Sequence, residues 1–383
     1  MSERLFEIID GLYPEYVKIW EDVCNIESPT ACKEGVDRVG KYLADYALAR
    51  GYEVEYFRHD VSGDVVCITS NKNAKEKPIT ISGHMDTVHP LGLFGTPAVK
   101  IEGDKMYGPG VTDCKGGIIV GILAMAALDK IGFDKRPVQL LLQSDEEGGS
   151  RGSKKATIGY MCEKSANSAA FLNLEPASKG KICVQRKGII TFTFKIKGIE
   201  AHSSSCATMG ANAIAEAAYK IIELEKLKDK DGLTCNCGVI SGGSVPNTVA
   251  GYCEFKANVR FVNSEQLAWV REYARKVAET VHVKGCECTL EEFGFRVAME
   301  KADRNYQLAE KINGIFDKVG LSQLELYGGL GGSDAADVTV YGKTPCVDCL
   351  GVLGGRIHSP EEYAEIDSLK EMAKRIASII YYF

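Results

Sequence analysis

Hydrophobic and polar positions follow two different periods in the first half of the chain. Residues 5–24 and 34–50 carry apolar side chains at helical spacing, and Gly51 ends the second stretch. Residues 115–131 are apolar on all sides, which predicts a long buried helix. Short, continuously apolar runs predict strands at residues 65–69, 78–82, 138–143 and 169–174. Such strands, separated by helices, indicate a mostly parallel sheet buried on both faces.

The pattern changes in the middle of the chain. Residues 190–197, ITFTFKIK, alternate strictly and predict a half-exposed strand. Further elements are predicted as a helix at 210–227, strands at 236–241 and 251–261, a helix at 264–281 and a strand at 287–293. This β-α-β-β-α-β order is typical of a small ferredoxin-like domain. A helix at 305–319 and strands at 323–327 and 346–350 then resume the α/β pattern.

We therefore expect two domains, because 383 residues exceed one ordinary hydrophobic core. Residues 1–186 and 296–383 should form a discontinuous α/β domain with a mixed, mostly parallel sheet flanked by helices. Residues 187–295 should form the inserted domain.

Charge and composition exclude several classes of function. The net charge of -6 comes with no basic cluster, which argues against a nucleic-acid partner. The longest uncharged apolar stretch, residues 116–128, is shorter than the roughly 20 residues of a membrane span, and the amino terminus is acidic and amphipathic. A cytoplasmic location is therefore expected, and the fourteen cysteines should be reduced thiols.

Acidic residues and a histidine follow three of the predicted strands. The strand ending at residue 82 leads to His84 and Asp86, the next to Glu146 and Glu147, and the last to Glu175. Parallel strands deliver their carboxyl ends to one edge of a sheet, where open α/β folds bind ligands. Because carboxylates and imidazoles together hold zinc, and two metals share a bridging acid, a two-metal hydrolase is the leading hypothesis.

The residues alone leave other interpretations open. Asp113 directly precedes the long apolar helix and could serve as its N-cap instead of a bridging ligand. Glu146 and Glu147 could belong to a solvated turn, although the glycines after them allow one carboxylate to reach a metal and the other a water. His202, after a predicted strand, is most simply a surface residue.

Motifs over nearly the whole chain carry a family resemblance. They are SGHMDTV, EGDKMYGPGVTDCKGG, SDEEGGSRGS, LNLEPAS, GIEAHSSSCATMGANAI, and GGSDAADV followed by GRIHS. In this order they resemble the zinc-dependent exopeptidases and deacylases that include glutamate carboxypeptidase, succinyl-diaminopimelate desuccinylase, acetylornithine deacetylase and aminoacylase. The similarity is strongest to bacterial glutamate carboxypeptidases. The resemblance implies the di-zinc exopeptidase fold, with the insert as a lid and dimerisation domain.

The resemblance also implies roles for individual residues. Asp113 would bridge two Zn²⁺ ions, with Co²⁺ or Mn²⁺ as possible substitutes. His84 and Glu175 would complete one metal site, and Glu147 and His358 the other. Glu146 would be the general base and acid, and Asp86 would orient His84. Cys114 departs from the family, because many relatives carry an acid there.

Residues of the inserted domain would complete the site in a homodimer. The resemblance implies that His202 reaches the active site of the partner subunit and stabilises the oxyanion. Substrate contacts would come from Asn247, Arg260 and Arg296 and from Gly331 and Gly332 of the glycine-rich loop. Arginine suits this role because its planar fork pairs with a carboxylate.

The expected activity is hydrolysis of an amide bond in a small peptide or N-acyl amino acid that carries a free carboxylate. Two alternatives stay open at this point. One is an aminopeptidase that acts on short peptides, and the other is a non-catalytic homologue that only binds metal or ligand.

Overall fold

The computed structural model describes residues 2–228 and 232–383, which fold into two compact units. The larger unit comprises the chain up to Gln185, Lys301–Gly329 and Ser333–Phe383. The smaller unit comprises Arg186–Glu300, within the described residues, and Leu330–Gly332.

A six-stranded sheet is the centre of the larger unit. Its order is β1 (Glu53–Phe57), β2 (Val65–Ser70), β6 (Val138–Gln143), β3 (Ile79–His84), β7 (Ala170–Asn173) and β14 (Cys346–Val347). Strands β6, β3, β7 and β14 are parallel, whereas β1 and β2 add an antiparallel edge. The predicted class, α/β with a mixed and mostly parallel sheet, is therefore confirmed.

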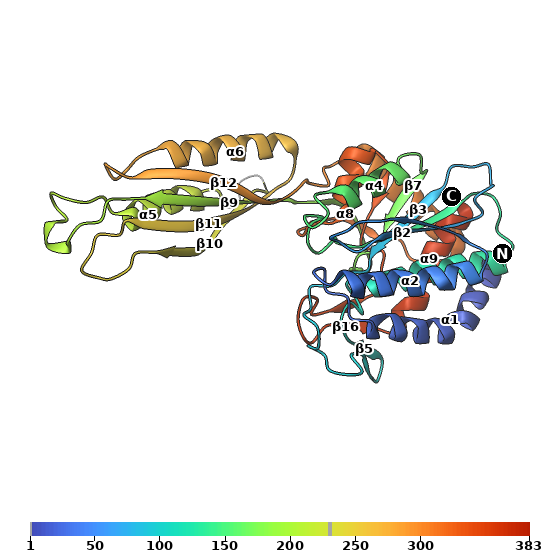
Figure 1. The fold of residues 1–383 in the computed structure, drawn as a ribbon. Coiled ribbons are helices and arrows are strands. Elements are labelled where there is room, and N and C mark those ends of the chain that lie inside the picture. Colours follow the sequence, from blue (N-terminus) through green and yellow to red (C-terminus); the bar gives the residue numbers. More distant parts are fainter. Residues whose placement is uncertain (1, 229–231) are drawn as a thin grey trace. The chain divides into compact units, whose positions relative to one another are not determined.

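Helices cover this sheet. They are α1 (Ser2–Asn25), α2 (Lys33–Ala49), α3 (Lys115–Lys130), α4 (Ala156–Ser165), α7 (Asp303–Val319), α8 (Asp334–Asp337) and α9 (Ser368–Tyr382). α1 and α9 lie on one side of the sheet and α4 on the other (Figure 1). Among the described residues, no helix is long and apolar enough to cross a membrane.

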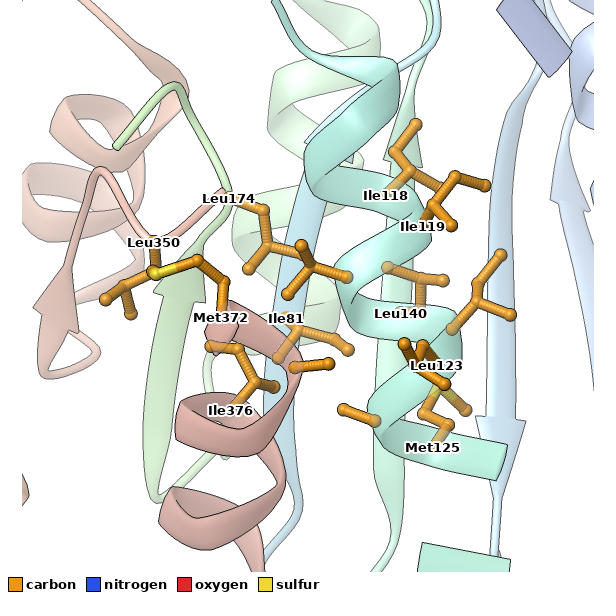
Figure 2. Close-up of a cluster of buried hydrophobic side chains, with 14 of the residues drawn as sticks. Ile81, Ile118, Ile119, Leu123, Met125, Leu140, Leu174, Leu350, Met372 and Ile376 are labelled. Carbon is orange, nitrogen blue, oxygen red and sulfur yellow. The ribbon is translucent and has the colours of Figure 1, made fainter. Parts of the chain in front are cut away.

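Helix α3 is apolar on all sides because it is enclosed on all sides. Ile118 and Leu123 of α3 pack among side chains of the sheet, such as Ile81, and of α9, such as Ile376 (Figure 2). All four side chains are fully buried, with 0% exposure. Each such side chain contributes about 1.5–3 kcal/mol by leaving water. The helix is thereby held firmly, and Asp113 lies two residues before its first residue.

Several short strands have no counterpart in the sequence prediction. β4 (Lys100–Glu102), β5 (Lys105–Tyr107), β16 (Tyr363–Glu365) and β15 (Gly354–Gly355) form a small antiparallel sheet, and β8 (Lys181–Arg186) is likewise unpredicted. β8 pairs with β13 (Glu325–Gly329), which corresponds to the strand predicted at residues 323–327. The unpredicted strands are too short or too exposed to show a clear period. The small sheet matters for function because Tyr363 lies opposite Tyr107, which joins the segment around His358 to the segment before Asp113.

The smaller unit has the predicted β-α-β-β-α-β order. Its elements are β9 (Gly188–Lys197), α5 (Ala213–Glu225), β10 (Thr234–Gly242), β11 (Tyr252–Phe261), α6 (Ser264–Glu279) and β12 (Glu287–Arg296). The four strands pair antiparallel in the order β10-β11-β9-β12. Phe194 and Phe255 stack at 4.7 Å in the core between the sheet and its helices.

Candidate metal centre

Strand register brings three polar segments together at one edge of the large sheet. In the parallel pairs, His84 lies opposite Gln143, and Ser82 lies opposite Asn173. The chain leaves these ends towards Glu146 and Glu147 after β6, and towards Glu175 after β7. These residues therefore lie at the sheet edge that the sequence analysis predicted as the ligand site.

Asp113 lies between two histidines. Its Oδ1 is 3.0 Å from Nε2 of His84, and its Oδ2 is 3.3 Å from Nε2 of His358. Glu175 Oε1 lies 3.8 Å from His84 Nε2, and Glu147 Oε2 lies 3.3 Å from His358 Nε2. The N-cap position of α3 is occupied by Cys114, whose side chain makes no capping hydrogen bond to the helix. The carboxylate of Asp113 is thus available to the two histidines and does not cap the helix.

These donor distances fit two metal ions that share Asp113. Zinc binds nitrogen and oxygen at about 2.1 Å in a tetrahedron, so two ligands of one ion lie roughly 3.4 Å apart. The observed separations of 3.0–3.8 Å cluster around that value. Imidazole and carboxylate donors suit zinc, cobalt and manganese alike, so the ligand set indicates divalent cations without selecting one.

Electrostatics at the site also favour a cation. Burial raises the pKa of Glu147 to about 7, and burial together with the charges of Asp113 and Glu146 raises the pKa of Glu175 well above its ordinary value. Hydrogen bonds to Asp113 and Glu147 raise the pKa of His358 to about 10. These carboxylates are buried close together, so their negative charges repel one another. Bound divalent cations would remove this electrostatic cost.

The carboxylate of Asp86 holds the turn that carries the two glutamates. Fully buried, it accepts hydrogen bonds from the backbone N–H groups of Glu146 and Glu147, both at 3.1 Å, and from the hydroxyl of Thr30 at 2.7 Å. It lies 3.4 Å from Nδ1 of His84, whose nearest acceptor is the backbone carbonyl of Asp86 at 2.9 Å. Asp86 thus contacts both the histidine and the glutamate turn.

The acidic run after β6 divides its side chains. Asp145 points into a structural network, accepting hydrogen bonds from the hydroxyl of Thr157 at 2.6 Å and the backbone N–H of Ser153 at 3.0 Å. Glu147 reaches His358, and the buried carboxylate of Glu146 lies near enough to influence the pKa of Glu147. The three neighbouring acids therefore have three different environments, unlike those of a solvated turn.

Some residues at the site were not identified as site residues from the sequence. Cys114, His84 and Glu175 form a group whose possible ligand atoms lie within 4.8 Å of one another, although the Cys114 thiol here donates to the carbonyl of Leu174 at 3.1 Å. The carboxylate of Glu362 accepts a hydrogen bond from the backbone N–H of Asp113 at 3.0 Å. Its place four residues after His358, in the same loop, is the one signal that could have identified it.

The smaller unit brings His202 and Asn247 together. His202 is exposed and caps the short helix η1 (Ser203–Ser205), with Nδ1 2.8 Å from the hydroxyl of Ser204. The N–H of Ser203 donates to the carbonyl of Asn247 at 2.9 Å. An exposed imidazole held by its neighbours is available to a second molecule, which is compatible with the role that the resemblance implies.

The two arginines and the glycine-rich loop form a second group in this unit. Arg260 on β11 and Arg296 on β12 both lie opposite Ile189 of β9, so all three share the sheet face away from the helices. Gly332 lies against Arg296 and Ile189, because a Cβ there would approach Cδ of Arg296 at 2.9 Å and Cδ1 of Ile189 at 3.2 Å. Arg186 donates to the carbonyl of Gly331 at 3.3 Å. Two guanidinium groups on one face can pair with an anionic group.

Comparisons with known proteins agree with this geometry. A sequence profile of peptidase family M20/M25/M40 matches residues 80–382. The chain belongs to this family. It is 28% identical to carboxypeptidase G2 of Pseudomonas sp. (strain RS-16) over 386 residues, which cover 98% of this chain and 91% of that protein. It is 24% identical to succinyl-diaminopimelate desuccinylase of Gluconobacter oxydans, covering 77% of this chain and 79% of that protein.

A solved structure shows the same fold. Aminopeptidase PepT of Bacillus cereus superposes with a TM-score of 0.79 at 22% identity, covering 100% of this chain and 98% of that one. The predicted resemblance, fold class and enzyme class are confirmed: this M20 protein is a hydrolase, of the metallopeptidase and deacylase kind.

Proposed function

We propose that this M20 enzyme is a two-metal hydrolase that cleaves an amide bond in a small peptide or N-acyl amino acid with a free carboxylate. The observation that carries the proposal is the position of Asp113, with one carboxylate oxygen towards His84 and the other towards His358. Such an arrangement suits a carboxylate shared by two cations. The names of the two relatives, a carboxypeptidase and a desuccinylase, support an amide substrate that bears a carboxylate.

Five residues would hold the metals in this proposal. His84 and Glu175 would bind one ion, Glu147 and His358 the other, and Asp113 both. Two bound divalent ions supply a polarised carbonyl and a water whose pKa falls from about 15.7 towards 7. Zinc is the proposed metal, and cobalt or manganese would fit the same donors.

Protein groups would carry the proton and orient the ligands. Glu146 would accept the proton of the attacking water and return it to the nitrogen of the leaving amine, because its carboxylate is buried and lies near enough to Glu147 and Glu175 to raise the pKa of both. Asp86 would keep His84 and the glutamate turn in place through the contacts described above. Arg260 and Arg296 would bind the substrate carboxylate, assisted by Asn247 and by the loop at Gly331 and Gly332.

The decisive experiment compares wild type with Glu146→Gln after loading with zinc. The amide keeps nearly the same shape but cannot accept the proton, so turnover should fall by at least about 10²–10⁴-fold while both metals stay bound. Substantial residual activity would rule out this assignment of the base. A chelator-treated sample is the control for metal dependence.

The substrate class is tested with a panel. N-acyl amino acids and peptides with a C-terminal carboxylate should be cleaved, and their amidated counterparts should not. Preference for free-amine tripeptides would instead identify an aminopeptidase, and no hydrolysis by the zinc-loaded protein would favour a binding homologue. Arg260→Lys and Arg296→Lys should raise KM for the carboxylate substrates, since lysine lacks the fork.

A homodimer is part of the proposal. β10 is an edge strand on which Val239 and Ile240 are 58% and 54% exposed, and exposed β-branched edge residues favour pairing with another strand. His202 would then act in the site of the partner subunit. Val239→Lys should shift sedimentation towards the monomer and lower activity, and an active monomer would contradict the role of His202.

A cytoplasmic location is also proposed. All fourteen cysteines lie in the described residues as free thiols, as expected for a reducing compartment. Cell fractionation would test this assignment.

A further inference from the structure

A buried histidine–glutamate pair lies beside the candidate metal centre without supplying a proposed ligand. Nε2 of His89 is 2.7 Å from Oε2 of Glu362, and these side chains are 5% and 1% exposed. Phe94 covers the imidazole edge-on, at 5.0 Å between ring centroids. Because a carboxylate only accepts, the imidazole donates from Nε2. A carboxylate buried this deeply is costly unless its remaining acceptor capacity is also filled.

The remaining bonds of Glu362 are to the chain around the bridging aspartate. Its Oε1 accepts from the backbone N–H groups of Thr112 at 2.9 Å and of Asp113 at 3.0 Å. Its Oε2 also lies 3.4 Å from the N–H of Gly110. These N–H groups precede α3 and so have no carbonyl of the helix to bind. Glu362 therefore sets the backbone position from which the Asp113 carboxylate extends.

Glu362 also anchors the loop that carries His358. The loop joins β15 to β16, and Glu362 is its last residue before β16. His358 itself is 52% exposed and has a left-handed φ of +62°, a conformation that a non-glycine residue keeps only where the rest of its loop holds it. Within this loop Glu362 is the deeply buried side chain. The same carboxylate thus ties the His358 loop to the Asp113 backbone.

We propose that Glu362 and His89 are positioning residues that set the distance between Asp113 and His358, and with it the metal affinity of the Asp113–Glu147–His358 site. The inference rests on the proposed two-metal function. The other site should depend on this pair less, because His84 and Glu175 come from the ends of buried strands β3 and β7. His89, in this scheme, holds the Glu362 carboxylate in the rotamer that reaches the two N–H groups.

Zinc binding provides the test, with competition by a chromophoric chelator on the full chain. Glu362→Met keeps the length of the side chain but leaves the N–H groups unpaired, and His89→Phe keeps a ring against Phe94 but removes the donor. We expect one of the two zinc ions to bind about 10–100-fold more weakly in Glu362→Met, with a smaller loss in His89→Phe. Glu362→Gln and His89→Gln, which keep an acceptor and a donor, should recover part of the affinity.

Glu216→Gln is the matched control for loss of a buried carboxylate. Glu216 is 1% exposed and accepts from the N–H groups of His282 at 2.9 Å and Val283 at 2.6 Å in the smaller unit. It should lower thermal stability and leave zinc affinity unchanged. A merely structural role for Glu362 would give the same result as this control.

The outcomes separate this inference from the proposed function. If wild type fails to bind two zinc ions, the two-metal function is wrong. If wild type binds two and the folded Glu362→Met and His89→Phe variants bind both with wild-type affinity, the inference is overturned. His89→Phe carries the test should Glu362→Met not fold, because it leaves the backbone bonds of Glu362 in place.

Discussion

Replacing Asp86 by asparagine tests the site at its most connected side chain. One oxygen, Oδ1, accepts from the N–H of Glu146, and the other, Oδ2, accepts from the N–H of Glu147 and the hydroxyl of Thr30. An asparagine can present its oxygen to only one side. The NH₂ group of the asparagine would then face another donor. The groups around the two oxygen positions, which include His84 Nδ1 and the two backbone N–H groups, offer it no acceptor.

The magnitude follows from counting these bonds. In its better orientation the asparagine keeps the two bonds at Oδ2 and loses the one to Glu146. A hydrogen bond to a charged group contributes about 1.5–3 kcal/mol, and the N–H left behind is buried. Each 1.4 kcal/mol is tenfold in binding, so displacement of the glutamate turn should weaken zinc binding by about 10–100-fold, which agrees with typical losses from residues behind metal ligands.

Two measurements check this expectation. Zinc affinity is measured by chelator competition, and the stability of the metal-free protein by denaturant unfolding. Thr30→Val removes only the hydroxyl donor and leaves both backbone N–H groups paired with Asp86, so its effect on zinc affinity should be smaller than that of Asp86→Asn. Asp64→Asn is the control, because Asp64 is also buried and accepts a backbone N–H, from His59 at 3.1 Å, but contacts no proposed ligand.

Unchanged zinc affinity in Asp86→Asn would refute the reasoning. It would mean that the glutamate turn keeps its geometry without the Asp86 carboxylate. A loss of stability without a loss of zinc affinity, as expected for Asp64→Asn, would reduce Asp86 to a structural residue.

Other predictions concern pH and packing. In chelator-treated protein the free energy of unfolding should fall as pH rises from 4.5 through about 7, since burial raises the pKa of Glu147 and the folded state then holds the proton more tightly than the unfolded state. It should fall further from pH 6.5 towards about 10, where His358 titrates, so a flat pH profile of denaturant unfolding would contradict both shifts. Gly117→Ala in α3 should destabilise the protein by about 1–3 kcal/mol or more, because its Cβ would lie 2.0 Å from the carbonyl oxygen of Leu174. Gly11→Ala in α1, with no atom within 4 Å, should instead stabilise by about 0.5–1 kcal/mol, and thermal unfolding of the pair would show whether the opposite signs hold.

The strands and helices with clear periods were predictable. The apolar runs at β2, β3, β6 and β7 agree with the sequence prediction to within a few residues, because burial on both faces leaves a continuous apolar pattern. Helices α1, α2, α3, α5, α6 and α7 also agree with it, whereas α4 and α9 were not predicted. The short strands β4, β5, β15 and β16 were not predicted. Two or three residues are too few to show a period, and the pairing that joins β5 to β16 links residues more than 200 positions apart.

The candidate site shows the same division. Glu146, Glu147 and Glu175 could be placed at one sheet edge because each follows a buried strand. Asp113 could not be distinguished from a helix cap by its own surroundings. Its relation to His358 depends on a loop that no local pattern links to it.

The sequence alone determined the order of elements, the sheet edge at which the acids gather and, through its motifs, the family. The tertiary structure decided which acid faces which histidine. It also placed Asp86 and Glu362, which are not proposed as metal ligands, in hydrogen bonds with the backbone of residues that are proposed as ligands. The physical reason is range: periodicity reports burial over a few residues, whereas the hydrogen bonds from Glu362 to Thr112 and Asp113 span about 250 positions and exist only in the folded chain.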